Sequence, residues 1–334
     1  MEMKTNIKAL ASFRILKMRQ SPKDKGLAIV KVKSLSKDLC RKLQKVRHLY
    51  WLATAECYVN SQKDINMIAS CSRSFDFHIV SSNQMAEQIR KHVPEARCMV
   101  LGAGEYLTDP KIFNVMNEGE RDIDFIASAN SFWTLKNFHK IFEMQKILKD
   151  QGIHTKSIVA CGSIKEQWYY DDCASYVKKY LGDDGKIIIG STIKQLKKLY
   201  NNSRFLVHLS NGDSSPRCIF EAILSGCRCI VAGPWIHSLN DWLSCGVVHQ
   251  IRKNDYSALP DLLKLQPDYN ASRSFNGKIG LKNVWPKITE FCISNLDKNF
   301  SSMGLFDSSC VGKQTFRDKE MQYAEELTYL EGLL

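Results

Sequence analysis

Short apolar runs alternate with longer stretches of helical periodicity along most of the chain. Apolar runs bounded by Gly, Ser or Asn are typical of buried strands, whereas apolar residues recurring three or four positions apart are typical of helices. This alternation predicts an α/β fold with parallel sheets. Strands are predicted at 27–32, 46–55, 77–80, 98–101, 122–128, 157–161, 186–190, 204–209, 227–233 and 247–251.

Helices are predicted between these strands and after the last one. The helices are expected at 37–45, 65–75, 85–92, 136–149, 165–181, 193–200, 216–225, 235–243, 256–265, 284–296 and 315–334. Two stretches lack clear periodicity, residues 129–135 and residues 266–280, and are predicted as loops. Residues 105–121, which include Pro110 and Gly119, are predicted to form a hinge.

The stretch 211–233, NGDSSPRCIFEAILSGCRCIVAG, carries the clearest chemical signal. A polar loop precedes Pro216, which suits the first position of a helix. Gly226 is expected to end that helix. The helix start offers free amides and a partial positive charge to an anion such as a diphosphate. Asp213 and Glu221 flank that place, and carboxylates suit hydroxyl groups rather than phosphates. A diphosphate between two hydroxyl-bearing groups describes a nucleotide-sugar.

An acid separated by seven residues from a glutamate and followed by AILSGCRCIVAG resembles the donor-site motif of retaining GT-B glycosyltransferases of the family 4 type. Most members have Glu at both acidic positions, and this chain has Asp213 at the first. The resemblance implies that Asp213 contacts the hydroxyls of the transferred sugar and that Glu221 contacts the ribose. It also implies that the donor diphosphate meets backbone amides near the helix start, in the segment Ser214, Ser215, Pro216 and Arg217.

The same resemblance implies two further donor contacts. Lys136 matches the lysine of the family's basic pair beside the diphosphate, and Asn130 stands where the arginine of that pair is expected. A fixed cation at this place would stabilise charge on the departing diphosphate. The segment IIIGSTIKQLKKLYNNSRFLVHLS resembles the family's base-binding region, so Gly190 and Ser191 are expected to contact the nucleobase.

The family fold is two Rossmann-like α/β domains that face each other across a cleft. We expect a first domain at 1–112, which is reduced because residues 1–30 lack the family's glycine-rich loop. We expect a donor-binding domain at 113–300. A helical tail at 301–334 is expected to pack back on the first domain. No DxD-type pair is placed to bind a metal, and no tightly bound cofactor is expected; the donor, a UDP- or GDP-sugar, is a substrate.

Charge is distributed unevenly. Residues 1–50 hold 14 Lys and Arg against 3 Asp and Glu, which is nearly all of the chain's net charge of +12. This favours an anionic partner: a glycan, a glycolipid, the membrane surface or nucleic acid. The twelve cysteines show no metal or disulfide spacing, and no apolar run is long enough to span a membrane. We therefore expect a cytoplasmic protein, with peripheral binding to the inner face of the membrane as an alternative.

Three functions fit these observations. The first is a hexosyltransferase of polysaccharide biosynthesis that moves a sugar to a glycan or glycolipid with retention of configuration. The second is an enzyme that transfers a sugar to modified bases of DNA, since contacts of a basic domain with phosphates dominate affinity for nucleic acid. The third is a binding protein without catalysis. This function would be consistent with the reduced first domain and with Asp213 and Asn130, which stand where the family has Glu and Arg. The nucleotide, the sugar, the acceptor and the oligomeric state stay open.

Overall fold

The computed structural model describes residues 26–31, 49–55, 77–80, 83–102, 104–105, 108–116, 118–210, 216–232 and 246–295. The chain divides into two compact units, residues 1–102 with 285–334, and residues 103–284. The domain boundaries at 112 and 300 stay predictions. The tail at 301–334 and the helices predicted at 37–45, 65–75, 235–243 and 315–334 lie outside the described residues.

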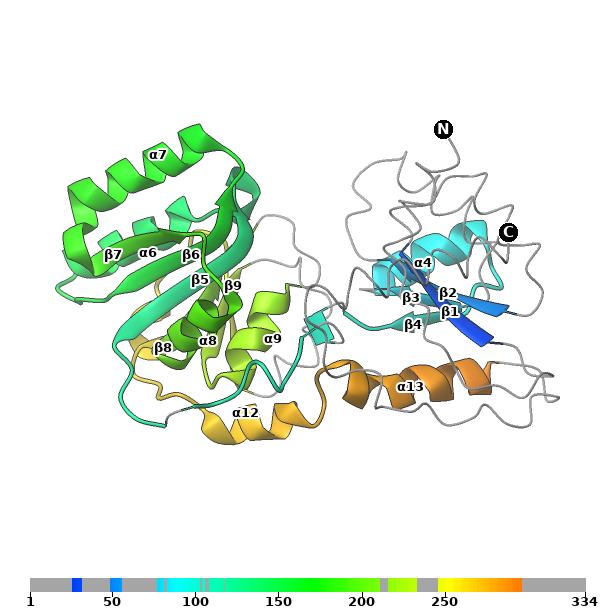
Figure 1. Cartoon of the computed structure of the whole chain (residues 1–334). Coiled ribbons are helices and arrows are strands. Elements are labelled where there is room, and N and C mark those ends of the chain that lie inside the picture. Colours follow the sequence, from blue (N-terminus) through cyan, green and yellow to red (C-terminus); the bar gives the residue numbers. More distant parts are fainter. Residues whose placement is uncertain are drawn as a thin grey trace. The chain divides into compact units, whose positions relative to one another are not determined.

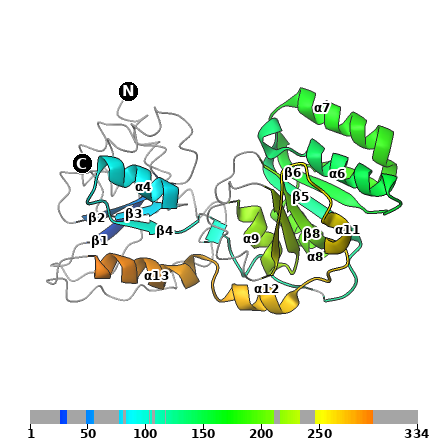
Figure 2. The same ribbon diagram turned by 180° about the vertical axis from the view of Figure 1, so that it is seen from behind.

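The first unit contains a parallel sheet whose four strands follow one another in sequence order. They are β1 (Gly26–Lys31), β2 (Leu49–Ala55), β3 (Phe77–Val80) and β4 (Cys98–Val100). Helix α4 (Asn83–His92) and helix α13 (Leu281–Ser294) lie on opposite sides of this sheet (Figures 1 and 2). The rings of Phe77 and Phe291 meet edge to face, with centroids 6.0 Å apart, so α13 packs against β3.

The second unit contains a six-stranded parallel sheet with the Rossmann strand order. Its strands are β5 (Ile123–Phe132), β6 (Ser157–Ile164), β7 (Gly185–Ile189), β8 (Ser203–His208), β9 (Arg228–Ala232) and β10 (Val248–Ile251). Across the sheet the order is β7-β6-β5-β8-β9-β10, which becomes 3-2-1-4-5-6 when the strands are counted within this unit. The predicted α/β class with Rossmann-like units is confirmed.

Helices cover both faces of this second sheet (Figures 1 and 2). Helices α6 (His139–Asp150) and α7 (Gln167–Tyr176) lie on one face, and α8 (Ile193–Asn201) and α9 (Arg217–Leu224) lie on the other. Successive residues of β5 point to alternate faces, so Phe125 joins the core under α6 and Ile126 joins the core under α9. None of the helices that the structure describes is long and apolar enough to cross a bilayer.

Strand β5 is longer than predicted, because it continues through residues 129–132 instead of ending at residue 128. It stays paired with β6 to its end, where Ser131 lies opposite Ser163 and Phe132 opposite Ile164. Phe132 is fully buried against Phe138. The polar residues before Phe132 interrupt the apolar run and hide the continuation of the strand. The chain then forms a short 3-10 helix (Thr134–Lys136), so the helix predicted from Lys136 begins three residues later.

Three further predictions need correction. Residues 266–280 were predicted as a loop, but they contain helix α12 (Tyr269–Asn276). The Asp268 side chain accepts a hydrogen bond from the Ala271 N–H and caps this helix, which buries Ser272 and Phe275. Conversely, the helix predicted at 256–265 is a single turn, α11 (Leu259–Leu262). Pro216 is the residue before α9 rather than its first position.

The structure gives free thiols at six cysteines: Cys98, Cys161, Cys173, Cys218, Cys227 and Cys229. Burial raises the pKa of the Cys173 thiol to about 12 and that of Cys227 to about 11. These thiols therefore stay protonated at neutral pH and act as small core side chains.

A buried arginine joins several elements of the second unit. One nitrogen of the Arg121 guanidinium donates to the Tyr200 carbonyl (3.0 Å) and to the Ser203 carbonyl (2.5 Å). The other donates to the Ser225 carbonyl (2.8 Å). The Tyr269 ring lies against the guanidinium, 5.2 Å from its carbon. The contacts thus tie the segment just before β5 to the ends of α8 and α9, the start of β8 and helix α12.

Gly226 faces this arginine and gives a direct test of how closely the region is packed. Gly226 follows the C-cap of α9 with φ +86°, and an added Cβ would lie 2.6 Å from an Arg121 nitrogen and 2.9 Å from the Tyr269 ring. We expect Gly226→Ala to cost about 2–5 kcal/mol of unfolding free energy, from backbone strain and overpacking together. Chemical denaturation measures this cost.

Gly152 provides the matched control. It occupies the same position after α6, with φ +81° and nothing within 4 Å of an added Cβ. Gly152→Ala should therefore show only the backbone cost, about 1–2 kcal/mol. Equal losses in the two variants would contradict the close packing at Arg121.

Candidate functional site

The candidate site lies at the carboxyl edge of the second sheet, between β5 and β8. In a sheet of this order, the neighbouring strands numbered 1 and 4 are the point where ligands generally bind. Two hydrogen bonds fasten the chain after β5 to the chain after β8. The Asn137 side chain donates to the Leu209 carbonyl (3.1 Å), and the Ser210 hydroxyl donates to the Leu135 carbonyl (3.0 Å). Asn137 adopts φ 59°, a left-handed conformation that asparagine tolerates better than most residues.

Lys136 lies on the short helical turn that these bonds hold in place. Its backbone N–H donates to the Trp133 carbonyl (3.0 Å), and its side chain is partly exposed. Burial raises the pKa of the Cys161 thiol to about 12, while the positive charge of Lys136 acts in the opposite direction. The ammonium group therefore lies in the neighbourhood of β6, at the same edge of the sheet.

Asn130, the predicted companion of Lys136, lies within β5 and not in a loop. Its side chain is exposed, and its backbone carbonyl accepts a hydrogen bond from the Ser163 hydroxyl (3.3 Å). Since an added Cβ at Gly162 would lie 2.9 Å from the same carbonyl oxygen, the two strands approach closely here. A role for Asn130 beside a diphosphate stays a prediction.

Three of the predicted residues, Asp213, Ser214 and Ser215, lie outside the described residues. Their neighbours in sequence are described. Ser210 is fastened to the turn of Lys136, and Pro216 precedes the first turn of α9. Both ends of the segment 211–215 therefore lie at the edge where β5 and β8 end.

Glu221 projects from α9, one turn after Arg217. Its Oε2 accepts a hydrogen bond from the Tyr200 hydroxyl (3.2 Å). Its Oε1 makes no hydrogen bond to any residue that the structure describes. Burial raises the pKa of the Glu221 carboxyl, while the Arg217 charge and the Tyr200 hydrogen bond oppose that rise. One carboxylate oxygen is thus left available at a partly exposed position.

Gly190 and Ser191 form the turn between β7 and α8. Gly190 has φ +79°, and the Ser191 N–H donates to the Cys161 carbonyl (3.1 Å). The Ser191 hydroxyl is buried and has no hydrogen-bond partner among the described residues. Leaving a buried hydroxyl unpaired costs about 1–3 kcal/mol, so the position favours a polar ligand atom.

Two residues behind Glu221, Tyr200 and Ser128, are not predicted from the sequence. Tyr200 is fully buried, and its hydroxyl lies 2.6 Å from the Ser128 hydroxyl as well as near Glu221. Buried tyrosines usually place their hydroxyl against a polar partner. The position of Tyr200 at the end of an amphipathic helix was the available signal, but nothing in the sequence pattern identifies Glu221 as its partner.

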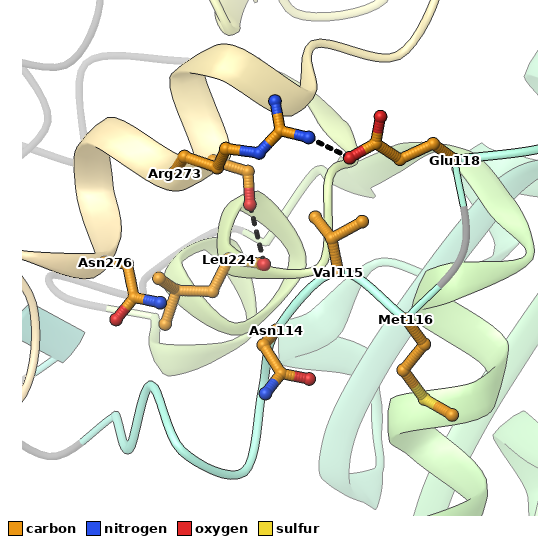
Figure 3. Close-up of a pocket in the computed structure, with 8 residues that line it drawn as sticks. Asn114, Val115, Met116, Glu118, Leu224, Arg273 and Asn276 are labelled. Atoms are coloured by element: carbon orange, nitrogen blue, oxygen red, sulfur yellow. Dashed lines mark hydrogen bonds and ion pairs between the residues drawn. The ribbon is translucent and has the colours of Figure 1, made fainter.

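A separate hollow of about 220 Å³ lies at the opposite edge of the unit (Figure 3). The residues that line it come from the segment before β5, from the end of α9 and from α12: Asn114, Val115, Met116, Glu118, Leu224, Ser272, Arg273 and Asn276. An ion pair between Arg273 and Glu118 spans it. Since α9 ends here and begins at the carboxyl edge of the sheet, the hollow is separate from the candidate site.

The raised pKa of the partly buried Glu221 carboxyl predicts a pH-dependent stability. A carboxyl whose pKa is higher in the folded than in the unfolded protein contributes stability below its unfolded pKa, and this is lost as pH rises through the folded pKa. We therefore expect Glu221→Gln to be more stable than the wild type at neutral pH. This advantage should shrink towards zero below the ordinary glutamate pKa of about 4.3.

Urea denaturation of both proteins across this pH range measures the difference. Glu120→Gln, which removes an exposed acid from the same unit, controls for the change in net charge. A Glu221→Gln protein that is less stable than the wild type at neutral pH would contradict the assignment of burial as the dominant effect.

Comparison with known proteins finds no matching family model and no curated protein that matches in sequence. Solved structures do match. HepE from Anabaena, in complex with UDP, is 13% identical with a TM-score of 0.63, over 80% of this chain and 79% of its own. Sucrose-phosphate synthase from Thermosynechococcus elongatus is 15% identical with a TM-score of 0.60, over 80% and 73%.

A third neighbour is the pneumococcal O-GlcNAc transferase GtfA, in complex with UDP and GlcNAc. It is 12% identical with a TM-score of 0.58, over 81% of this chain and 57% of its own. HepE has also been crystallised with UDP-glucose. At these identities the likeness concerns the fold. The chain shares the GT-B type of fold with glycosyltransferases.

Proposed function

We propose that this protein is a glycosyltransferase that moves a hexosyl unit from a nucleotide-sugar to an acceptor hydroxyl with retention of configuration. One observation carries the proposal. The turn of Lys136 and the start of α9 lie at the edge between β5 and β8, and Glu221 projects from α9 one turn after its start. A cation and a helix start suit a diphosphate, and an acid with an available oxygen suits a hydroxyl-bearing group.

The donor would lie along this edge with each part against a different element. The diphosphate would take the place between Lys136 and the first turn of α9. The ribose hydroxyls would donate to Oε1 of Glu221. The nucleobase would reach the turn of Gly190 and Ser191, where the buried Ser191 hydroxyl gains a hydrogen bond. The transferred sugar would lie against Asp213.

In this proposal the residues stabilise charge on the donor and form no covalent bond to the sugar. In the transfer, the bond between the anomeric carbon and the diphosphate oxygen breaks, and the acceptor oxygen bonds to the same face of that carbon. The acceptor's proton leaves with the nucleoside diphosphate. Negative charge grows on the diphosphate as its bond to the sugar stretches, so the Lys136 ammonium would stabilise the transition state more than the ground state.

The solved neighbours favour a uridine nucleotide as the first donor to test. HepE was crystallised with UDP and with UDP-glucose, and GtfA with UDP and GlcNAc. These ligands are those of the neighbours, and they support UDP-sugars ahead of GDP-sugars for this chain. The Ser191 hydroxyl can either donate to or accept from a base edge, so it is compatible with both.

The acceptor is proposed from charge alone. Residues 1–50 carry nearly all of the net positive charge, and this favours an anionic glycan, glycolipid or membrane surface in polysaccharide biosynthesis. The same charge would suit transfer to modified bases in DNA. Binding to duplex DNA that falls steeply with added salt would favour the DNA acceptor, and no DNA retention at low salt would exclude it.

A ligand panel tests the donor site. We expect UDP-glucose or another UDP-sugar to raise the thermal midpoint, because a ligand at about 100 times its Kd stabilises the folded state by about 2.7 kcal/mol. GDP-, ADP- and CMP-sugars should give smaller shifts. Lys136→Ala should weaken binding by about tenfold to a hundredfold, which corresponds to the loss of one charged contact.

Lys253→Ala removes an exposed lysine from a turn of the same unit and serves as the control. Calorimetric titration gives the Kd of each variant. A protein that responds to no activated sugar would reject the proposed function. Equal affinities in Lys136→Ala and the wild type would reject Lys136 as a diphosphate contact. Binding without any hydrolysis or transfer would favour a binding protein without catalysis.

A further inference from the structure

Tyr200 is fixed from three directions within the second unit. Its side chain is fully buried. Its ring meets the buried Phe113 ring edge to face, with centroids 5.9 Å apart. Its backbone carbonyl accepts hydrogen bonds from Arg121 (3.0 Å) and from the Cys227 thiol (3.0 Å). Both the ring and the backbone of the residue are therefore held in place.

The Tyr200 hydroxyl is the middle of a chain of three polar groups. It lies 2.6 Å from the Ser128 hydroxyl of β5 and 3.2 Å from Oε2 of Glu221. Burial raises the pKa of Tyr200 well above its ordinary value, so the phenol keeps its proton. Since the phenol has one proton and an ionised Glu221 can only accept, Tyr200 donates to Glu221, and Ser128 donates to Tyr200.

This geometry leaves Glu221 with one occupied oxygen and one available oxygen. A carboxylate held by a single rigid donor cannot turn freely about its side-chain bonds. Its second oxygen is therefore directed at a set place before any ligand arrives. A contact that is arranged in advance loses less entropy on binding than one that must be ordered at that moment.

We infer that Tyr200 is a positioning residue that aims the Glu221 carboxylate at the ribose of the donor, and so makes the site prefer ribonucleotides over 2′-deoxyribonucleotides. The inference rests on the proposed function and deepens it. Tyr200 itself does not touch the ligand. Its hydroxyl sets the place of an oxygen that does.

The preference for ribonucleotides depends on whether the bound nucleotide leaves Oε1 of Glu221 without a hydrogen bond. A ribose hydroxyl donates to Oε1, whereas a deoxyribose leaves that oxygen facing a carbon. Sites arranged to bond a hydroxyl reject analogues that lack it, because a desolvated polar group is left without its partner. Glu221 is only partly buried. We therefore expect about tenfold to a hundredfold preference for the ribonucleotide, the range of one hydrogen bond to a charged group.

The test compares the Kd of UDP and of 2′-deoxy-UDP by calorimetric titration, in the wild type and in Tyr200→Phe. The phenylalanine keeps the ring contact with Phe113 and removes only the hydroxyl. We expect Tyr200→Phe to lose most of the preference, to within about threefold, through weaker binding of UDP. Binding of 2′-deoxy-UDP should change little, whereas general damage to the site would weaken both nucleotides equally.

Tyr169→Phe is the matched control. Tyr169 is a buried tyrosine of the same unit whose hydroxyl accepts a hydrogen bond from the His139 backbone N–H (3.0 Å), under the other face of the sheet. It should keep the full preference. If Tyr200→Phe fails to fold, Ser128→Ala provides a second test, because it removes the hydrogen bond between the Ser128 and Tyr200 hydroxyls. This variant should lose part of the preference for UDP.

The outcomes separate the two proposals. A wild type that binds neither nucleotide overturns the proposed function and this inference with it. A wild type that binds UDP and 2′-deoxy-UDP equally overturns the inference and leaves nucleotide binding intact. If Tyr200→Phe keeps the preference for UDP over 2′-deoxy-UDP, groups other than Tyr200 position the Glu221 carboxylate. If Tyr200→Phe loses equal affinity for both nucleotides, Tyr200 has a merely structural role.

Discussion

The arrangement of the second unit depends most on the hydrogen bonds of the Arg121 guanidinium. No carboxylate among the described residues pairs with this buried charge. Backbone carbonyls of Tyr200, Ser203 and Ser225 accept its hydrogen bonds instead. Two of these carbonyls belong to the last residue but one of α8 and to the C-cap of α9, where helices leave carbonyls without partners of their own. The Arg121 side chain thus binds the ends of two helices and the start of strand β8 at one place.

This arrangement at the amino edge of the sheet also determines the carboxyl edge. Helices α8 and α9 run back across the sheet between parallel strands, so both begin at the carboxyl edge. Helix side chains lean towards the start of their helix. Tyr200 and Glu221 therefore lean away from Arg121 and towards the candidate site, where the Tyr200 hydroxyl meets Oε2 of Glu221. A residue held by its carbonyl at one edge supports an acid near the other.

The sequence predicts the strands well because a strand covered by helices on both faces is apolar along its whole length. Strands β6 to β10 each begin within one residue of the prediction. It fails where a polar residue continues an element, as Asn130 does inside β5, and where a cap starts a helix of few apolar residues, as Asp268 does for α12. At β5 the deciding contact is with a residue distant in sequence, Tyr169 beside Phe132. At α12 it is the local hydrogen bond from the Ala271 N–H to Asp268.

The same distinction applies to the site. Lys136 and Glu221 are predicted as donor contacts from residue type and from their place just beyond a strand or within the following helix, which can be read from the local sequence. Tyr200, Ser128 and Asn137 act through partners that only the fold brings near. Their signals, a buried hydroxyl and a left-handed asparagine, become meaningful once those partners are known. A sequence motif therefore predicts candidate ligand contacts, whereas the groups that hold those contacts are found only from the fold.

At identities of 12 to 15%, the fold is retained with few shared residues, because alternating burial and a handful of backbone contacts specify it. A Rossmann sheet alone indicates only a ligand at the carboxyl edge. The combination of charges narrows the choice. A helix start and a lysine favour phosphate, whereas an acid supported by a neutral phenol repels phosphate and selects hydroxyls. The proposed ligand, a nucleotide-sugar, carries both a diphosphate and polyhydroxylated groups.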